Sequence, residues 1–327
     1  MTGNSRTRSE RLFDLEDSRG RPRNLTAMSQ LRHDPLSGLD VIVAAGRAAR
    51  PVTFAPRTEA DTGLVECPFC PGNEAETPPE VARVGGGAPN GPGWMVRAFP
   101  NLYPIVDAHE VVVLSPDHDH SFADLDDHEA VAVVRLLRDR VRTFVDTGHA
   151  FGFAIVNHLR EAGASIAHPH AQVFALEVVP RAVEEALART AAAGVDLVEV
   201  DRAGDDLVVA QDGDVTVWCP RASTSRYLFR VSHADAGECF DLAPDAVVDE
   251  VTIALRDAIR RLRALLGDAP YNVVVHTAPR NHAPFHWYVE VTPRVSVIAG
   301  FEQATGVLVN TVPPEDAAVA LRAVSIR

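Results

Sequence analysis

The sequence predicts an α+β protein made of two similar strand-rich units in tandem, each an antiparallel-rich sheet with flanking helices. Short β-branched runs such as 110–114 alternate with amphipathic helical stretches such as 124–147. Two segments of the sequence are also similar: a predicted strand ending at Asn157 is followed by HPHAQ, and a predicted strand ending at His276 is followed by HAPFH. We therefore expect a mobile arm over 1–25, a first unit over 26–195 and a second unit over 196–327.

The elements follow from local patterns along the chain. Helical spacing of apolar residues, opened by acidic residues in the clearest case, predicts helices over 124–147, 181–193, 244–266 and 314–323. The Gly/Pro-rich stretch 82–93 predicts an exposed loop. Runs rich in β-branched and aromatic residues predict strands over 39–44, 110–114, 151–156, 171–176, 207–210, 215–218, 227–231, 272–276 and 287–291.

Charge and composition exclude several classes of protein. The formal net charge of -14 argues against nucleic acid as a partner. All 31 basic residues are Arg, so phosphate groups would bind to Arg, His and backbone amides rather than to Lys. No apolar stretch is long enough to cross a membrane, and the polar start of the chain does not resemble a secretory signal. We therefore expect a cytoplasmic protein.

The segment CPFCPGNE (67–74) is the sharpest local motif. Cys67 and Cys70 are spaced so that two thiolates at one turn can bind a tetrahedral metal ion such as zinc. A redox-active thiol pair is the alternative, although the following Pro-Gly-Asn suggests a turn rather than the helix that a thioredoxin-type pair would open. A zinc site needs two more ligands, for which histidines such as His118 and His168 are suitable.

The segment GASIAHPHAQ (163–172) is the second motif. In a strand, His168, His170 and Gln172 would point to the same face, which is an unusual pattern for a packed core. A neutral imidazole is a good nucleophile toward phosphorus, and Ser165 and Gln172 can donate hydrogen bonds to phosphoryl oxygens. The motif therefore predicts phosphoryl chemistry, whereas we interpret His109 as a surface or structural residue.

Six motifs in order make the chain resemble the galactose-1-phosphate uridylyltransferase family of the histidine-triad superfamily. The resemblance extends from about Arg32 to the C-terminus, and it implies two tandem histidine-triad-like units. It is carried by segments 32–51, CPFCPGNE, FPNLYP (99–104), HEVVVLSPDH (109–118), AGASIAHPHAQ and AGFEQATG (299–306).

The resemblance implies a role for each matching residue. His170 would be the nucleophile that becomes nucleotidylated, with Ser165 and Gln172 at the α-phosphoryl group. One zinc ion per chain would be bound by Cys67, Cys70, His118 and His168. The substrate-binding residues implied by the match are Arg32, Arg50, Asn101, Asn157, Phe301 and Glu302; Phe301 could instead belong to the core.

The expected reaction is ping-pong transfer of a nucleoside monophosphate, by default UMP, between sugar 1-phosphates, as in exchange of UDP-glucose with galactose 1-phosphate. The expected ligands are thus a nucleotide sugar and a sugar 1-phosphate. The nearer alternative is adenylyl transfer from ADP-glucose to phosphate, and the more distant one is a non-catalytic nucleotide-binding protein. Relatives with HWHIE differ from this chain at Tyr288, and a second metal site is not expected. The resemblance also implies a homodimer.

Overall fold

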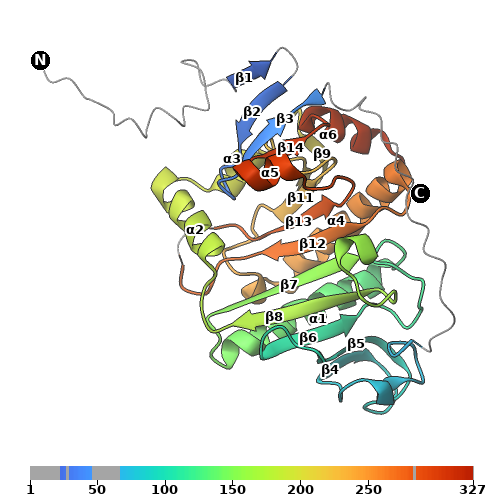
Figure 1. Ribbon diagram of the computed structural model, residues 1–327. Helices are drawn as coiled ribbons and strands as arrows, with labels where there is room; N and C mark the ends of the chain where they lie inside the picture. The colour runs from blue at the N-terminus through green and yellow to red at the C-terminus, as the bar shows by residue number, and fades with distance from the viewer. Residues whose placement is uncertain (1–22, 27–28, 46–66, 283–284, 327) are drawn as a thin grey trace, which may run out of the picture.

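The computed structural model describes residues 23–26, 29–45, 67–282 and 285–326, and a ten-stranded sheet organises most of them (Figure 1). The strand order is β4-β5-β6-β8-β7-β12-β13-β11-β10-β9, and neighbouring strands of this sheet pair antiparallel. The strands are β4 (Ala82–Gly85), β5 (Trp94–Pro100), β6 (Ala108–Val113), β7 (Phe151–His158), β8 (His170–Leu176), β9 (Val208–Asp212), β10 (Val215–Trp218), β11 (Phe229–His233), β12 (Tyr271–His276) and β13 (Tyr288–Pro293).

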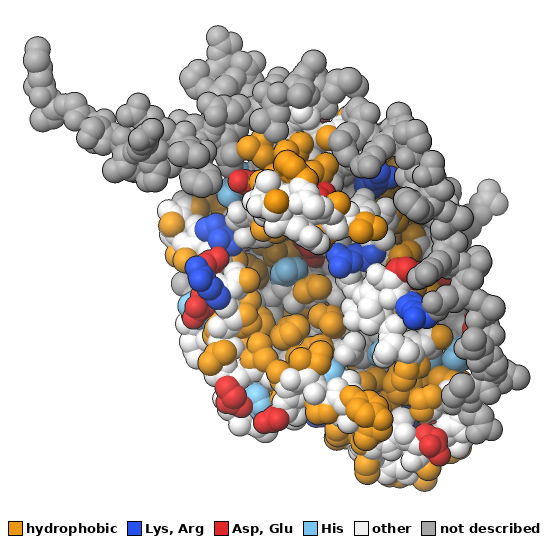
Figure 2. All heavy atoms as spheres, in the orientation of Figure 1, with side chains coloured by type: hydrophobic (Ala, Val, Ile, Leu, Met, Phe, Trp, Pro, Cys, Tyr) orange, Lys and Arg blue, Asp and Glu red, His pale blue; other side chains and the backbone are white. Residues whose placement is uncertain are grey.

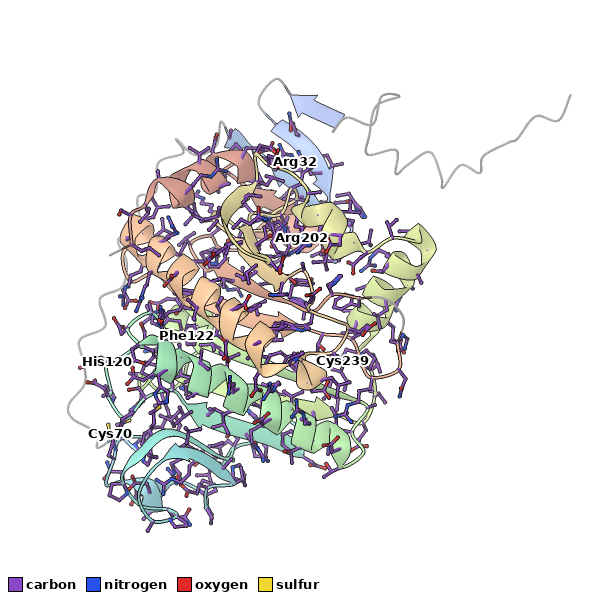
Figure 3. All side chains as sticks on the ribbon, turned by 180° about the vertical axis from the view of Figure 1, so that it is seen from behind. Arg32, Cys70, His120, Phe122, Arg202 and Cys239 are labelled. Atoms are coloured by element: carbon purple, nitrogen blue, oxygen red, sulfur yellow. The ribbon has the colours of Figure 1, made fainter. Side chains whose placement is uncertain are left out.

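Two long helices cover one face of this sheet, α1 (Asp127–Asp146) and α4 (Asp245–Leu266) (Figure 3). Asp126 caps the N-terminus of α1 in a capping box. Its carboxylate accepts from the Glu129 N–H, and the Glu129 carboxylate accepts from the Asp126 N–H. The buried sides of both helices pack into one core with alternate strand residues such as Ala171 and Val231. The helices therefore leave the opposite face of the sheet for the polar side chains.

A smaller sheet lies beside the large one and joins distant parts of the chain. Its order is β1-β2-β3-β14, with β1 (Arg23–Thr26), β2 (Ser29–His33), β3 (Asp40–Val43) and β14 (Leu308–Asn310). Strand β14 runs parallel to β3, so a segment near the end of the described chain completes a sheet that begins near its start. The remaining helices are α2 (Arg181–Ala193), α3 (Leu197–Arg202), α5 (Gly300–Thr305) and α6 (Pro314–Ala323), with short 3-10 turns at Glu74–Glu76, Arg160–Ala162 and Phe240–Leu242.

The two halves of the chain share the large sheet through strands β7 and β12. These strands pair antiparallel, with Asn157 directly opposite Asn272. The register matters because residues that lie opposite one another across paired strands point to the same face. Polar side chains from the first and second halves are thus brought onto one surface.

The α+β prediction is confirmed, and the predicted strands and helices correspond to elements of the structure. The prediction of a loop over 82–93 is wrong in part, because Ala82–Gly85 forms β4 at the sheet edge before the turn begins. The pattern did not predict β2, β5, β14, α3 or α5. Strand β1 begins at Arg23, and the rest of the predicted arm lies outside the described residues.

Candidate active site and metal centre

Four side chains from three separate segments meet near one edge of the large sheet. Cys67 and Cys70 lie on the turn before Glu74–Glu76, His118 follows β6, and His168 lies two residues before β8. Their potential ligand atoms are all within 4.8 Å of one another. Asn73 stabilises the turn by donating from Nδ2 to the Cys67 carbonyl oxygen at 2.9 Å. Figure 3 shows Cys70 beside the lower strands of the sheet, in the segment that precedes β4.

The spacing of these atoms fits a tetrahedral metal site. Sulfur ligands at about 2.3 Å and nitrogen ligands at about 2.0–2.1 Å from a tetrahedral ion lie about 3.6 Å from each other. Cys70 Sγ is 3.4 Å from His118 Nδ1 and 3.6 Å from His168 Nδ1, and Cys67 Sγ is 3.7 Å from His168 Nδ1. The four side chains could therefore bind a metal ion with little movement.

The two thiols also need a cation to become ligands. Burial, together with the adjacent Cys67, raises the pKa of the Cys70 thiol to about 11. A bound divalent ion would reverse this effect, because a coordinated thiol loses its proton. The donor set of two thiolates and two imidazoles is one that zinc favours.

His168 connects this cluster to the start of β8. Its side chain is fully buried, and its Nε2 donates to the Ser115 carbonyl oxygen at 2.8 Å, which leaves Nδ1 free to face the cysteines. The backbone carbonyl oxygen of His168 lies 2.9 Å from His170 Nδ1. A histidine ligand whose other nitrogen is hydrogen-bonded has a fixed orientation, so the cluster also fixes this carbonyl group.

His170 is buried at the first position of β8, with 6% of its surface exposed. The His168 carbonyl oxygen can only accept, so His170 Nδ1 carries the proton and Nε2 of the neutral ring carries a lone pair. Burial lowers the pKa of His170, which favours the neutral ring. Phe69 packs edge-on against the imidazole at 5.4 Å between ring centres. The ring is thus held in its neutral form, and its Nε2 makes no hydrogen bond within the part of the chain that the structure describes.

Gln172 lies on the same face of β8, two residues along from His170. Its Oε1 is 2.9 Å from Nε2 of His109, a buried residue of the adjacent strand β6. Asn101 also belongs to this group, because its Nδ2 lies 3.1 Å from the same imidazole nitrogen. The structure therefore brings together two predicted residues, Gln172 and Asn101, through a third that was interpreted as structural.

Asn157 is the second-to-last residue of the neighbouring strand β7 and lines a small pocket together with His168, His170 and Ala164. Its Oδ1 accepts from Asn272 Nδ2 at 2.8 Å. Figure 2 shows this face of the molecule, with hydrophobic side chains exposed across its middle. Of the predicted residues in the 157–172 region, Asn157 and Gln172 are thus partly exposed, whereas His168 and His170 are buried.

The other predicted residues lie elsewhere. Ser165 is exposed on the loop before His168 and makes no hydrogen bond to His170. Arg32 is bound to Glu315 at 2.9 Å, which joins β2 to α6. Glu302 accepts from the Ala299 N–H at the start of α5, and Phe301 is 49% exposed there. Arg50 lies outside the described residues, and the substrate-binding roles of all these residues stay predictions.

Sequence reasoning missed two residues of this surface, His109 and Asn272. His109 opens the predicted strand HEVVVL, but nothing in its neighbourhood indicates that it reaches Gln172. Asn272 opens the strand that precedes the second histidine passage. Both contacts depend on how strands far apart in the sequence are paired, and the sequence pattern does not fix that register.

The comparisons with known proteins agree with this geometry. A family model described as "Domain of unknown function (DUF4921)" matches residues 115–324. ADP-glucose phosphorylase of Arabidopsis thaliana is 28% identical over 334 residues, which cover 91% of this chain and 93% of that protein. Galactose-1-phosphate uridylyltransferase of Streptomyces lividans is 30% identical over 173 residues, which cover 51% of this chain and 43% of that protein.

Solved structures show the same likeness. The crystal structure of the Arabidopsis thaliana ADP-glucose phosphorylase with bound ADP-glucose superposes with a TM-score of 0.81 at 28% identity, over 91% of this chain and all of that one (100%). A uridylyltransferase structure shares the fold, with a TM-score of 0.69 at 22% identity over 90% of this chain and 98% of that one. The chain therefore belongs to the DUF4921 family, and its homologues include galactose-1-phosphate uridylyltransferases and ADP-glucose phosphorylase, which confirms the predicted resemblance.

Proposed function

We propose that this protein transfers an adenylyl group from an ADP-sugar such as ADP-glucose to inorganic phosphate, through a covalent adenylyl-His170 intermediate. The observation that carries the proposal is the buried His170, whose Nδ1 donates to the His168 carbonyl oxygen and whose Nε2 is free. The full-length similarity to an ADP-glucose phosphorylase favours adenylyl over uridylyl transfer. Nucleotidyl transfer as such is common to both groups of relatives.

In the first step, the lone pair of His170 Nε2 attacks the α-phosphorus of the ADP-sugar. The bond from that phosphorus to the bridging oxygen breaks, and sugar 1-phosphate leaves with the electron pair. This leaving group needs no proton near neutral pH. The positive charge that develops on the imidazole ring is stabilised by the hydrogen bond from Nδ1 to the His168 carbonyl oxygen, 2.9 Å long.

In the second step, an oxygen of inorganic phosphate attacks the same phosphorus and releases His170, so that ADP is formed. The NH2 groups of Gln172 and Asn157 and the hydroxyl group of Ser165 would donate to the phosphoryl oxygens in both steps. None of these groups is an acid that could readily protonate a leaving group. This chemistry favours transfer between phosphate acceptors over hydrolysis.

We further propose that the metal ion is zinc, one per chain, bound by Cys67, Cys70, His118 and His168. When bound, it would neutralise two thiolates and give the cluster a fixed geometry. His168 would then keep its carbonyl oxygen aimed at His170 Nδ1. We thus assign the metal a structural role: through His168 it would fix the orientation of His170.

Uridylyl transfer between UDP-glucose and galactose 1-phosphate, the default expected from sequence motifs, is the second candidate. The partial matches to two galactose-1-phosphate uridylyltransferases favour it, although each covers about half of this chain. A homodimer, a cytoplasmic location and a sugar-binding role for Glu302 remain predictions. Within the described ranges, no helix is both long and apolar enough to span a bilayer.

Mass spectrometry of the intact protein after incubation with ADP-glucose or UDP-glucose tests the proposal. We expect an AMP adduct on His170 with ADP-glucose, loss of that adduct on addition of phosphate, and release of ADP. A UMP adduct with UDP-glucose alone would move the assignment to the second candidate. A protein that forms neither adduct, with its metal bound, would contradict covalent nucleotidyl transfer.

A further inference from the structure

The oxygen atoms of the two side-chain amides at the site each face a donor on a neighbouring strand. Gln172 Oε1 lies 2.9 Å from His109 Nε2, and Asn157 Oδ1 lies 2.8 Å from Asn272 Nδ2. An amide whose oxygen is held in this way turns its NH2 group to the other side. This orientation decides whether the amide donates to a phosphoryl oxygen or repels it.

We propose that His109 and Asn272 are positioning residues, which hold the amides of Gln172 and Asn157 so that both NH2 groups are presented to the phosphoryl oxygens of the substrate. The inference deepens the proposed function and rests on it. It assigns a task in phosphoryl recognition to a residue of the second half of the chain, Asn272.

The tautomer of His109 follows from its neighbours. The backbone N–H of Ile105 donates to His109 Nδ1 at 3.2 Å, so in the neutral ring the proton is on Nε2. Asn101 Oδ1 accepts from the Tyr103 N–H at 2.8 Å, so the Asn101 atom that lies 3.1 Å from His109 Nε2 is Nδ2, a donor that cannot accept the Nε2 proton. Among the described residues, Gln172 Oε1 is therefore the acceptor left for the Nε2–H group.

The surroundings of His109 hold the ring in place. The residue is 3% exposed, and its ring stacks on Phe174 with centroids 4.1 Å apart and an angle of 23° between the planes. Burial lowers the pKa of His109, opposed in part by the hydrogen bond to Gln172, so the ring stays neutral and keeps this tautomer. A rigid donor of fixed tautomer leaves the Gln172 amide one favourable orientation.

Asn272 holds Asn157 in a similar way. Both hydrogen atoms of its amide nitrogen are used, one toward Asn157 Oδ1 and one toward the Ala162 carbonyl oxygen, each at 2.8 Å. Asn272 and Asn157 lie directly opposite each other in the pairing of β7 with β12. The NH2 group of Asn157 then faces Gly163. A Cβ atom placed on this glycine would lie 3.6 Å from Asn157 Nδ2.

Double-mutant cycles on the full-length, metal-loaded protein test the inference. His109→Phe keeps an aromatic ring for the stack on Phe174 but removes the Nε2–H donor. We expect it to slow formation of the adenylyl-His170 intermediate by roughly 10- to 100-fold, as for loss of one oriented donor at a reacting oxygen. The same substitution made in a Gln172→Ala background should cost less than about threefold, because no amide is left to orient.

The second cycle pairs Asn272→Ala with Asn157→Ala and should show the same coupling. His233→Phe is the matched control, since His233 is a buried histidine that accepts a backbone N–H, from Asp235, on Nδ1 and contacts Glu250 through Nε2. It should leave the rate of adduct formation unchanged. Rate losses that simply add in both cycles would show that His109 and Asn272 are only structural, and would overturn the inference.

An NMR measurement separates this inference from the proposed function. The ¹⁵N shifts of His109 in the ligand-free protein should report a neutral ring protonated at Nε2 throughout the neutral pH range. A proton on Nδ1, or a charged ring, would overturn the inference whether or not the protein is active. Failure of the wild-type protein to form any adduct would instead contradict the proposed function, and the tautomer would still decide the role of His109.

Discussion

Strand pairs β7–β8 and β12–β13 have the same register but carry different chemistry. In the first pair, Gln172 lies opposite Ile155. In the second pair, Glu290 lies opposite Val274, so Gln172 and Glu290 hold equivalent places in the two halves. The neutral amide of the first half is thus replaced by a carboxylate in the second.

The first residues of the two strands, two positions before Gln172 and Glu290, also differ. His170 begins β8 with a free ring nitrogen, whereas Tyr288 begins β13 and is 4% exposed, with its ring stacked on His276 at 4.6 Å. The Arg230 guanidinium lies over the same tyrosine ring, 5.2 Å from its centre. The place of the proposed nucleophile is therefore filled by a packed aromatic side chain in the second half.

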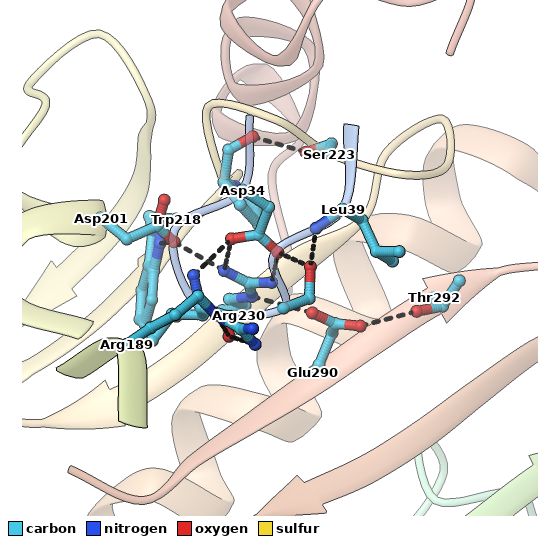
Figure 4. Close-up of polar contacts among 12 residues, drawn as sticks. Asp34, Leu39, Arg189, Asp201, Trp218, Ser223, Arg230, Glu290 and Thr292 are labelled. Atoms are coloured by element: carbon cyan, nitrogen blue, oxygen red, sulfur yellow. Dashed lines mark hydrogen bonds and ion pairs between the residues drawn. The ribbon is translucent and has the colours of Figure 1, made fainter. Parts of the chain in front are cut away.

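A buried ion network occupies the rest of this region (Figure 4). Arg230 is 3% exposed and binds Asp34 at 2.8 Å, Asp201 at 2.9 Å and Glu290 at 2.8 Å. Burial alone would raise the pKa of Asp34, but the charge and hydrogen bonds of Arg230 outweigh it and hold the pKa at about 2. Burial raises the pKa of Asp201 instead.

The comparison shows that the same arrangement of strands can be used in two ways. In the first half, Gln172 and Asn157 keep hydrogen-bonding capacity for a ligand, which is a requirement of binding and catalysis. In the second half, the polar groups of Arg230 and its partners are used within the protein. Under the proposed function, equivalent strands thus serve catalysis in the first half and stability in the second.

The largest effect is expected when the first residues of β8 and β13 are replaced by residues that cannot act as nucleophiles. His170→Ala should lower the rate of nucleotidyl transfer by on the order of a thousandfold or more, because it removes the nucleophile. Tyr288→Phe keeps the ring and should leave the rate within a few fold. Steady-state kinetics with ADP-glucose and phosphate measure both variants, and an equally large loss for Tyr288→Phe would remove the distinction between the halves.

The second test concerns stability. Arg230→Met should lower the free energy of unfolding by about 3–5 kcal/mol, since it leaves the buried carboxylate of Asp34 and the partly buried carboxylate of Glu290 without a counter-charge. Arg181→Met is the control, because Arg181 pairs with Glu185 on the surface, with 89% of the arginine side chain exposed. Urea unfolding should show no measurable change for the control, and a stable Arg230→Met variant would refute the role given to the network.

The third test asks whether the metal belongs to the first half alone. Cys67→Ser should lower the metal content from about one ion per chain to well below half, and should also lower the midpoint of thermal unfolding. Cys239→Ser makes the same atomic change at a buried cysteine of the second half and should keep the metal. Elemental analysis of purified protein gives the answer, and equal metal content in the two variants would exclude the assigned ligands.

The smallest effect is expected at His286, which joins β13 to α3. Its Nδ1 faces the Asp196 carboxylate and its Nε2 lies 3.0 Å from the Ala234 carbonyl oxygen, so both nitrogens contact acceptors. The hydrogen bond to Asp196 raises the pKa of His286 above 6.5, although burial opposes it. The pKa of Asp196 is lowered, because the hydrogen bond and charge of His286 outweigh burial.

A group with a raised pKa stabilises the fold fully below its unfolded pKa and loses that contribution as pH rises through the folded value. His286→Gln should therefore cost about 1 kcal/mol between roughly pH 4 and 6.5, and less as pH rises through the raised pKa of His286. His120→Gln, at a half-exposed pair with Asp117, is the control. Stability curves at several pH values measure the effect, and a difference that grows toward alkaline pH would contradict it.

Local patterns predicted most of the secondary structure because it depends on neighbours in the sequence. The long helices α1 and α4 have strong amphipathic spacing, and motif resemblance led to the four side chains that meet in the metal cluster. Strand β14 was missed because it has three residues, and β4 because its glycine suggested a loop.

The remaining features depend on contacts between distant segments. His109 reaches Gln172 across 63 positions, Asn272 reaches Asn157 across 115, and Arg230 reaches Asp34 across 196. The first two contacts require a particular pairing of strands, in which a shift by one residue would turn every side chain to the opposite face, and the third requires the turn after β2 to lie against the large sheet. No local pattern contains that information.

The parallel pairing of β14 with β3 also has a consequence for synthesis of the protein. Strand β3 is made early, but its partner Leu308–Asn310 emerges only after nearly all the rest of the described chain. At about 5–20 residues per second, translation would leave that strand edge unpaired for on the order of tens of seconds. An open edge of this kind can pair with other chains, so the nascent protein needs protection there until its last strand arrives.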